Sequence, residues 1–88
     1  MVTDLCRWLR LRWYHTHDSR RSNAGFPDLV IVGPGEVIYA ELKSERGRLS
    51  SAQAEWIEAL NAAGTKAYVW RPSDMREISQ ILRDLARG

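Results

Sequence analysis

The sequence predicts an α/β fold in which a small mixed sheet is covered by helices, in the order helix-strand-strand-helix-strand-helix. Three observations predict it: two β-branched apolar runs around a Gly-Pro turn, a capped amphipathic segment after them, and a third apolar run followed by another helical stripe. A hairpin followed by a strand-helix-strand crossover combines antiparallel and parallel pairs and leaves helices on the faces of the sheet. The 88 residues suffice for one compact domain over positions 1–88.

The chain opens with a segment that we expect to form a short amphipathic helix over residues 3–13. Thr3 or Asp4 is available as its N-cap. The residues at helical spacing are Leu5, Trp8, Leu9 and Arg12. Residues 17–25 carry no periodicity and many turn formers, so they predict an exposed loop, where function often resides.

A β-hairpin is the simplest interpretation of residues 29–42. Residues 29–32 and 37–42 are rich in β-branched side chains, and the four residues between them are Gly-Pro-Gly-Glu. The next element is a helix from Ser50 to about Ala63, because Ser50 opens a capping box and Gly64 supplies a stop. Its expected apolar side consists of Ala52, Trp56, Ala59, Leu60 and Ala63.

The last two predicted elements are a strand over residues 66–70 and a helix that begins at residues 72–74. Pro72 suits the first turn of that helix, because its missing amide hydrogen is not needed there. The helix carries a single apolar stripe made of Met75, Ile78, Leu82 and Leu85.

Charge and cysteine content narrow the classes of function. The net charge is +2 and the pI near 9.0, with a local excess of arginine between positions 7 and 21. That excess suits a phosphate partner, and a solvated basic face explains it equally well. Cys6 is the only cysteine, which excludes an internal disulfide and indicates a reducing compartment. With no apolar run of the roughly 20 residues that a membrane span needs and no signal peptide pattern, we expect a cytoplasmic protein with no membrane partner.

Two acids and a lysine are predicted to converge at one end of the hairpin. If Pro34 and Gly35 form a two-residue turn, Asp28 lies directly opposite Glu41, and Lys43 points to the same face as Glu41. A slip of one residue would separate the acids, because Pro-Gly prefers a type II turn over the primed turns of tight hairpins. Hard oxygen ligands select Mg²⁺ or Mn²⁺, and a neighbouring lysine can orient an attacking water. The alternative is that these are ordinary charges at a strand edge.

These residues carry a resemblance to known nucleases. Gly25-Phe26-Pro27-Asp28-Leu29, followed by Glu41-Leu42-Lys43, resembles the paired motif of the PD-(D/E)XK nuclease superfamily, whose members share a restriction-endonuclease-like core. Within that superfamily, Gly47-Arg48-Leu49-Ser50 with Gln53 and Trp56 is similar to the VRR-NUC family of virus-type replication-repair nucleases. The resemblance covers roughly positions 13 to 82.

The resemblance implies a DNA endonuclease that depends on Mg²⁺ or Mn²⁺. Asp28 and Glu41 would be metal ligands together with the carbonyl of Leu42, Lys43 would be the catalytic lysine, and Gln53 the active-site glutamine. The family's lone viral and bacterial members resemble Holliday-junction resolvases, which act as dimers on branched DNA. The resemblance therefore implies a homodimer that acts on Holliday-junction or flap DNA, and it is compatible with phage or prophage origin.

One departure from the family favours a different function. Family members usually carry a Glu early in the first helix, and matching back from Tyr14 places it before Met1, so Asp4 is the only candidate substitute. A non-catalytic DNA-binding module with an incomplete metal site is therefore the alternative, and a protein-interaction domain with a basic face is a third hypothesis.

The remaining candidates have structural as well as functional explanations. The capping box alone explains Gln53, and Trp56 suits the core better than a base-stacking role because it lies on the apolar side of its helix. His15 and His17 share a face if extended, but they have no evident third ligand, so a surface or DNA contact is preferred to zinc. The candidate DNA contacts are His15, Ser19, Arg20, Arg21, Ser22, Arg46 and Arg48.

Overall fold

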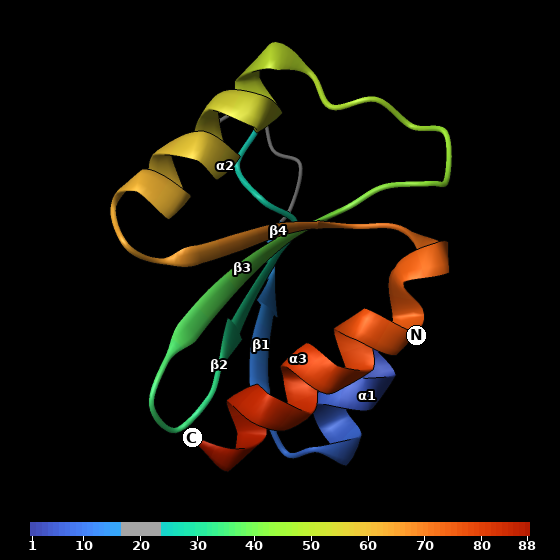
Figure 1. Ribbon diagram of the computed structural model, residues 1–88, viewed down its shortest axis with the longest axis vertical. Helices are drawn as coiled ribbons and strands as arrows, with labels where there is room; N and C mark the ends of the chain where they lie inside the picture. The colour runs from blue at the N-terminus through green and yellow to red at the C-terminus, as the bar shows by residue number, and fades with distance from the viewer. Residues whose placement is uncertain (17–23) are drawn as a thin grey trace.

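A mixed sheet with helices on both faces forms the body of the protein (Figure 1). The computed structural model describes residues 1–16 and 24–88, and in these ranges the sheet has four strands in the order β1-β2-β3-β4. The strands are β1 (Arg12–His15), β2 (Leu29–Val32), β3 (Val37–Leu42) and β4 (Lys66–Trp70). The pairs β1–β2 and β2–β3 are antiparallel, and β3–β4 is parallel. The predicted α/β mixed sheet is confirmed.

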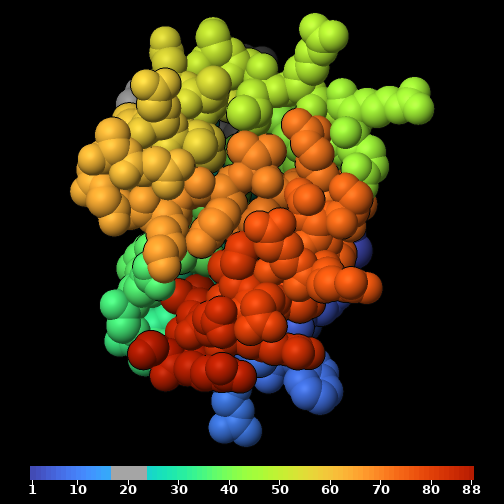
Figure 2. Space-filling view, in the orientation of Figure 1, coloured from blue at the N-terminus to red at the C-terminus, as the bar shows by residue number. Residues whose placement is uncertain are grey.

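The helices lie in two groups on opposite sides of the sheet. The α1 (Val2–Trp8) and α3 (Met75–Arg87) helices pack together on one face, and α2 (Ser51–Ala62) lies on the other (Figure 1). A short 3₁₀ turn, Pro72–Asp74, leads into α3. In Figure 2 the α2 and α3 surfaces are well separated, and side chains of the segment after β3 project from the body of the protein. Within the described residues, no helix is long and apolar enough to cross a membrane.

The predicted first helix over residues 3–13 is wrong in its second half. The α1 helix ends at Trp8, and Arg10 has a φ of 60°, which a right-handed helix cannot accommodate. The chain then turns into the edge strand β1, which pairs with β2. Trp8 is consequently 85% exposed instead of packed. Helical spacing at Trp8 and Arg12 arose by coincidence, because the pairing that makes residues 12–15 a strand involves a distant part of the chain.

The main core lies between the sheet and the α1–α3 pair. Buried and less buried residues alternate along β2, as expected of a strand with one buried face. The core residues on the strands are Leu29, Ile31, Ile38, Ala40 and Trp70. They pack with the predicted stripe of α3, of which Ile78, Leu82 and Leu85 are buried and Met75 is half-buried. Each fully buried Leu or Ile contributes roughly 1.5 to 3 kcal/mol. Cys6 belongs to this core, and burial raises the pKa of its thiol to about 11.

The α2 helix lies against the sheet less deeply than its sequence predicts. None of its residues is fully buried, and Ala59 and Ala63 of the expected apolar side are exposed. Trp56 is half-buried, with its ring edge-on to Phe26 at 5.0 Å between centroids. Asn61 ties the end of the helix to β4, because its side chain makes hydrogen bonds of 3.0 and 3.1 Å with the backbone of Ala67. The hydrogen bonds of Asn61 therefore help to hold α2 against the sheet, where α3 relies on buried apolar side chains.

The hairpin register is the one predicted from a two-residue turn. Leu29 pairs with Ala40 and Val32 with Val37, and the amide of Gly33 donates to the carbonyl of Glu36 at 2.8 Å. Gly35 does not adopt a positive φ, so the turn is not of type II. The shift of register by one residue that a type II turn could have caused is therefore absent. Continuing this register by one step places Asp28 opposite Glu41, at the end of the hairpin.

Candidate active site

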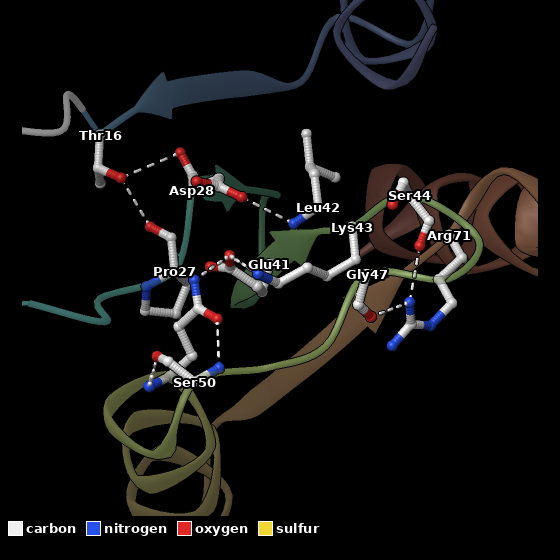
Figure 3. Close-up of polar contacts among 11 residues, drawn as sticks. Thr16, Pro27, Asp28, Glu41, Leu42, Lys43, Ser44, Gly47, Ser50 and Arg71 are labelled. Carbon is white, nitrogen blue, oxygen red and sulfur yellow. Dashed lines mark hydrogen bonds and ion pairs between the residues drawn. The ribbon is translucent and has the colours of Figure 1, made fainter.

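Asp28 and Glu41 lie side by side where β2 begins and β3 ends (Figure 3). Glu41 is on the face of the sheet that carries Tyr39, which is the face towards α2, because side chains two residues apart in a strand share a face. The register places the two residues opposite each other, and the negative charge of Asp28 raises the pKa of Glu41. The predicted meeting of the two acids is confirmed.

The backbone around Asp28 is held on both sides. The amide of Leu42 donates to Asp28 Oδ2 at 2.8 Å. The hydroxyl of Thr16 donates to the carbonyl of Pro27 at 2.8 Å, and the amide of Thr16 donates to the carbonyl of Asp28 at 2.8 Å. Thr16 therefore fixes the point at which the chain enters β2. Sequence analysis missed this role, because nothing in the sequence signals that residue 16 returns to residues 27 and 28.

The orientation of Leu42 brings its carbonyl to the same side as Asp28. In an extended strand the N–H and C=O groups of one residue point to the same neighbouring strand. Since the N–H of Leu42 reaches Asp28, its C=O is directed to that side of β3 as well. Lys43, the next residue, alternates in the opposite direction, and its amide donates to the carbonyl of Trp70 in β4 at 2.9 Å.

Glu41 is a buried carboxylate with an unsatisfied oxygen. Only 3% of the residue is exposed, and its Oε2 accepts a hydrogen bond from Gln53 Nε2 at 3.0 Å. Its Oε1 is buried and has no hydrogen-bond partner within residues 1–16 and 24–88. Burial and the neighbouring Asp28 raise the pKa of Glu41 to about 7. A buried acceptor without a donor is unfavourable, and a cation placed between the two acids would relieve both the lost hydrogen bond and the repulsion.

Lys43 joins the two acids, as predicted. Its Nζ lies 4.0 Å from Glu41 Oε2, and its side chain is 19% exposed. In Figure 3 the lysine side chain extends along the same face as Glu41. The ammonium group favours the charged form of Glu41, but burial and Asp28 have the larger effect on the Glu41 pKa.

The donor set fits a hard dication that keeps several waters. It comprises the carboxylates of Asp28 and Glu41 and the carbonyl of Leu42, all of them oxygen donors. In the described part of the chain, no group of three His, Cys, Asp or Glu side chains could hold a metal ion. Asp4 does not supply a third acid: it is exposed and pairs with the amino group of Met1 and with Arg7. An ion here would be held by two carboxylates, a carbonyl and water.

The segment between β3 and α2 is held in place by Arg71. Its Nη1 donates to the carbonyls of Ser44 at 2.7 Å and Gly47 at 2.6 Å (Figure 3). The carboxylate of Glu45 accepts a hydrogen bond from the hydroxyl of Ser73 at 2.9 Å. Sequence analysis did not assign this role to Arg71, since its only signal is an arginine directly after a strand.

The structure describes three of the seven residues that were predicted to contact DNA. Arg46 and Arg48 are exposed on the segment held by Arg71, and His15 is exposed at the end of β1. Ser19, Arg20, Arg21 and Ser22 lie outside the described residues, as does His17. The structure therefore brings Asp28, Glu41, Leu42, Lys43 and Gln53 together, and three basic residues lie on the elements that lead away from them.

Comparisons with known proteins point to one family. The sequence profile of the VRR-NUC domain matches residues 3–74. The Fanconi-associated nuclease 1 homolog of Schizosaccharomyces pombe (strain 972 / ATCC 24843) is 40% identical over 47 residues, which cover 51% of this chain and 7% of that protein. A solved structure described as a VRR_NUC domain protein superposes with a TM-score of 0.68 at 22% identity, covering 94% of this chain and 84% of that chain. At that identity the structural likeness concerns the fold alone.

Proposed function

The chain belongs to the VRR-NUC domain family, and we propose that residues 1–88 form a single nuclease domain that hydrolyses phosphodiester bonds of DNA with Mg²⁺ or Mn²⁺. One observation carries this proposal: the buried Glu41 carboxylate, beside Asp28, has an oxygen with no donor among the described residues. Two acids that repel each other in a buried place are costly for a structural role and useful for holding a dication. The relative in S. pombe is itself named as a nuclease.

Each residue of the site has a distinct task in this proposal. Asp28, Glu41 and the carbonyl of Leu42 would hold the ion, which would supply Lewis-acid chemistry by polarising the scissile phosphate and lowering the pKa of a water. Lys43 orients the attacking water and offsets the negative charge that develops on the phosphoryl oxygens. Gln53 fixes the rotamer of Glu41 through its 3.0 Å hydrogen bond. The water oxygen bonds to phosphorus and gives up a proton to solvent, the bond from phosphorus to the leaving oxygen breaks, and that oxygen takes a proton from solvent, so that the strand is cleaved internally.

We propose branched DNA, a Holliday junction or a flap, as the substrate and a homodimer as the active form. Exposed Arg46 and Arg48 suit phosphate contacts on either side of a junction arm. A chain of 88 residues buries a smaller fraction of its surface than a larger domain does, so dimerisation would add stability. The buried, uncrosslinked thiol of Cys6 suits a reducing intracellular compartment, and phage or prophage origin belongs to the same proposal.

A second candidate function is a DNA-binding module without catalytic activity. The observation that favours it is the lack of a third acid near Asp28 and Glu41 in the described part of the chain. Such a module would bind junction DNA in a salt-sensitive way and would form no products with either metal.

Cleavage assays on matched variants test the proposal. A labelled four-way junction, a flap and a plain duplex are incubated with the purified protein, with and without Mn²⁺ or Mg²⁺. Asp28→Asn and Lys43→Ala are compared with Asp84→Asn and Lys66→Ala, which alter the same residue types at exposed positions far from the site. We expect metal-dependent cleavage that the first two variants lose at least 100-fold and the two controls retain.

Three outcomes separate the candidates. Cleavage that persists in both Asp28→Asn and Lys43→Ala would contradict the proposed site. Binding of the junction without products in either metal would favour the DNA-binding module. Equal cleavage of all three substrates would leave a nuclease but overturn its selectivity for branched DNA, and sedimentation of the protein with and without DNA tests the dimer.

A further inference from the structure

A cavity of about 260 Å³ lies at the end of the sheet, next to the candidate active site. Leu42 and Lys43, the two residues that follow Glu41, line it, and so does His15 at the end of β1. The start of α1 and the start of α3 line it from the side away from α2. The cavity therefore shares residues with the proposed metal site, although the side chain of Leu42 points to the opposite face of the sheet from Glu41.

The lining of the cavity is mostly apolar and includes two cationic side chains. Leu42, Trp70, Met75 and Ile78 supply apolar surface, and Trp70 and Ile78 also belong to the main core. Among the side chains of the lining, those of Lys43 and Arg71 are cationic. A phosphate or a sugar placed against the apolar part of the lining would lose its hydration without compensation. The cavity can accept a flat, weakly hydrated group whose attached anionic group stays outside the cavity.

From this arrangement we propose that the cavity binds one unpaired nucleobase of the DNA, that of a nucleotide adjoining the scissile phosphate. The inference rests on the proposed nuclease function and names a specificity site for it. A volume of about 260 Å³ falls just below the usual range for drug-sized ligands, so it suits a single base and not a stacked pair. The base lies against apolar and aromatic side chains, while Lys43 and Arg71 lie near the phosphate of the same nucleotide.

A base pocket at this position would account for the proposed selectivity for branched DNA. In an intact duplex the base must first leave its stack and its partner, which costs free energy. At a flap or a junction that cost is smaller, because the base is already unpaired or easily unpaired. The same cavity would thus favour cleavage next to a branch without any base-edge hydrogen bonds, and its sequence preference should be weak.

A binding experiment tests the cavity without catalysis. Wild-type protein in EDTA is mixed with flap DNA that carries 2-aminopurine at one position, moved nucleotide by nucleotide through the branch point. We expect a change in 2-aminopurine emission at one position, beyond the change seen at its neighbours. Met75→Trp and Thr3→Phe, which fill the cavity from two different helices, should abolish it. Gln80→Trp, at an exposed position of α3, should retain it.

A kinetic cycle tests the same contact during cleavage. An abasic nucleotide at the position found above should lower kcat/KM of the wild-type protein about tenfold, as expected for loss of one stacked base. In Met75→Trp the abasic substitution should have almost no further effect, because the base can no longer enter. Thermal unfolding of each variant shows that it is folded, and Thr3→Phe replaces Met75→Trp if the latter is not.

The outcomes distinguish failure of the pocket from failure of the nuclease. Additive effects of the abasic site and the cavity-filling substitution, in protein that cleaves DNA through Glu41, would overturn the pocket and leave the nuclease intact. Filled variants that are more stable and unchanged in every DNA measurement would assign the cavity to packing alone, which also overturns the pocket. If no cleavage occurs in any metal, the nuclease proposal fails, and the 2-aminopurine experiment in EDTA still decides whether the cavity takes a base.

Discussion

The side-chain amide of Gln53 donates to Glu41 Oε2 at 3.0 Å while its own oxygen accepts from the amide of Ser50 at 2.8 Å. The helix-cap contact predicted from the sequence is therefore present, and the same side chain also contacts the buried acid of the candidate site. One amide joins the first turn of α2 to the buried carboxylate at the end of β3. No residue of α2 is fully buried. The Gln53 side chain nevertheless ties the first turn of this helix to the site.

Separating the two contacts of Gln53 gives the first prediction. Ser50→Ala removes only the cap and should lower the free energy of unfolding by about 1 kcal/mol, with kcat unchanged. Gln53→Ala also removes a hydrogen bond to a carboxylate, so it should cost about 2 to 3 kcal/mol and lower kcat. Denaturant unfolding and single-turnover cleavage measure the two effects. Equal losses of kcat in the two variants would show that the Glu41 contact has no role beyond the cap.

Stability of the metal-free protein should fall as pH rises from about 4.5 to about 7. Burial and Asp28 raise the pKa of Glu41 from 4.5 to about 7, so between these values the folded state binds a proton that the unfolded state has lost. The free energy of unfolding therefore decreases over that range, by up to about 3 kcal/mol. Unfolding in EDTA at a series of pH values measures it. Glu41→Gln should flatten this dependence, and Glu58→Gln, at an exposed position of α2, should keep it.

Arg46 and Arg48 are expected to contact DNA phosphates. Each contact that is lost should lower the slope of log K against log salt by about 0.9 for duplex DNA. Fluorescence anisotropy with Arg46→Gln and Arg48→Gln over a range of salt concentrations measures this slope. Arg83→Gln removes an exposed charge from α3 and serves as the control. Slopes that are identical in all four proteins would place the phosphate contacts elsewhere.

Apart from its charge near the phosphate, Arg71 should act on DNA binding through the segment that it holds. Arg71→Lys keeps the charge but cannot reach the carbonyls of Ser44 and Gly47 in the same geometry, because lysine lacks the guanidinium fork. We expect a raised KM, faster amide exchange in residues 44–47, and a loss of stability of about 1 kcal/mol. Hydrogen exchange and steady-state kinetics measure these effects. An unchanged exchange rate in that segment would show that Arg71 does not restrain it.

The features that sequence predicts well here are local. The turn and the alternating strands set the hairpin register, and with it the meeting of Asp28 and Glu41. The edge strand β1 was missed because its partner, β2, lies more than ten residues away and the spacing of Trp8 and Arg12 imitates a helix. The roles of Thr16 and Arg71 depend on hydrogen bonds to residues distant in the sequence. No local pattern in the sequence predicts such contacts.

Measuring Mn²⁺ binding tests most directly whether Asp28 and Glu41 form a metal site. Titration followed by the electron paramagnetic resonance signal of free Mn²⁺ should reveal one site per chain in the wild-type protein, and thermal unfolding should show that the ion stabilises the fold. Asp28→Asn and Glu41→Gln should each weaken that site at least tenfold, while Asp84→Asn should leave it unchanged. Binding of Mn²⁺ with the same affinity to wild-type protein and to Glu41→Gln would contradict a metal site formed by Asp28 and Glu41.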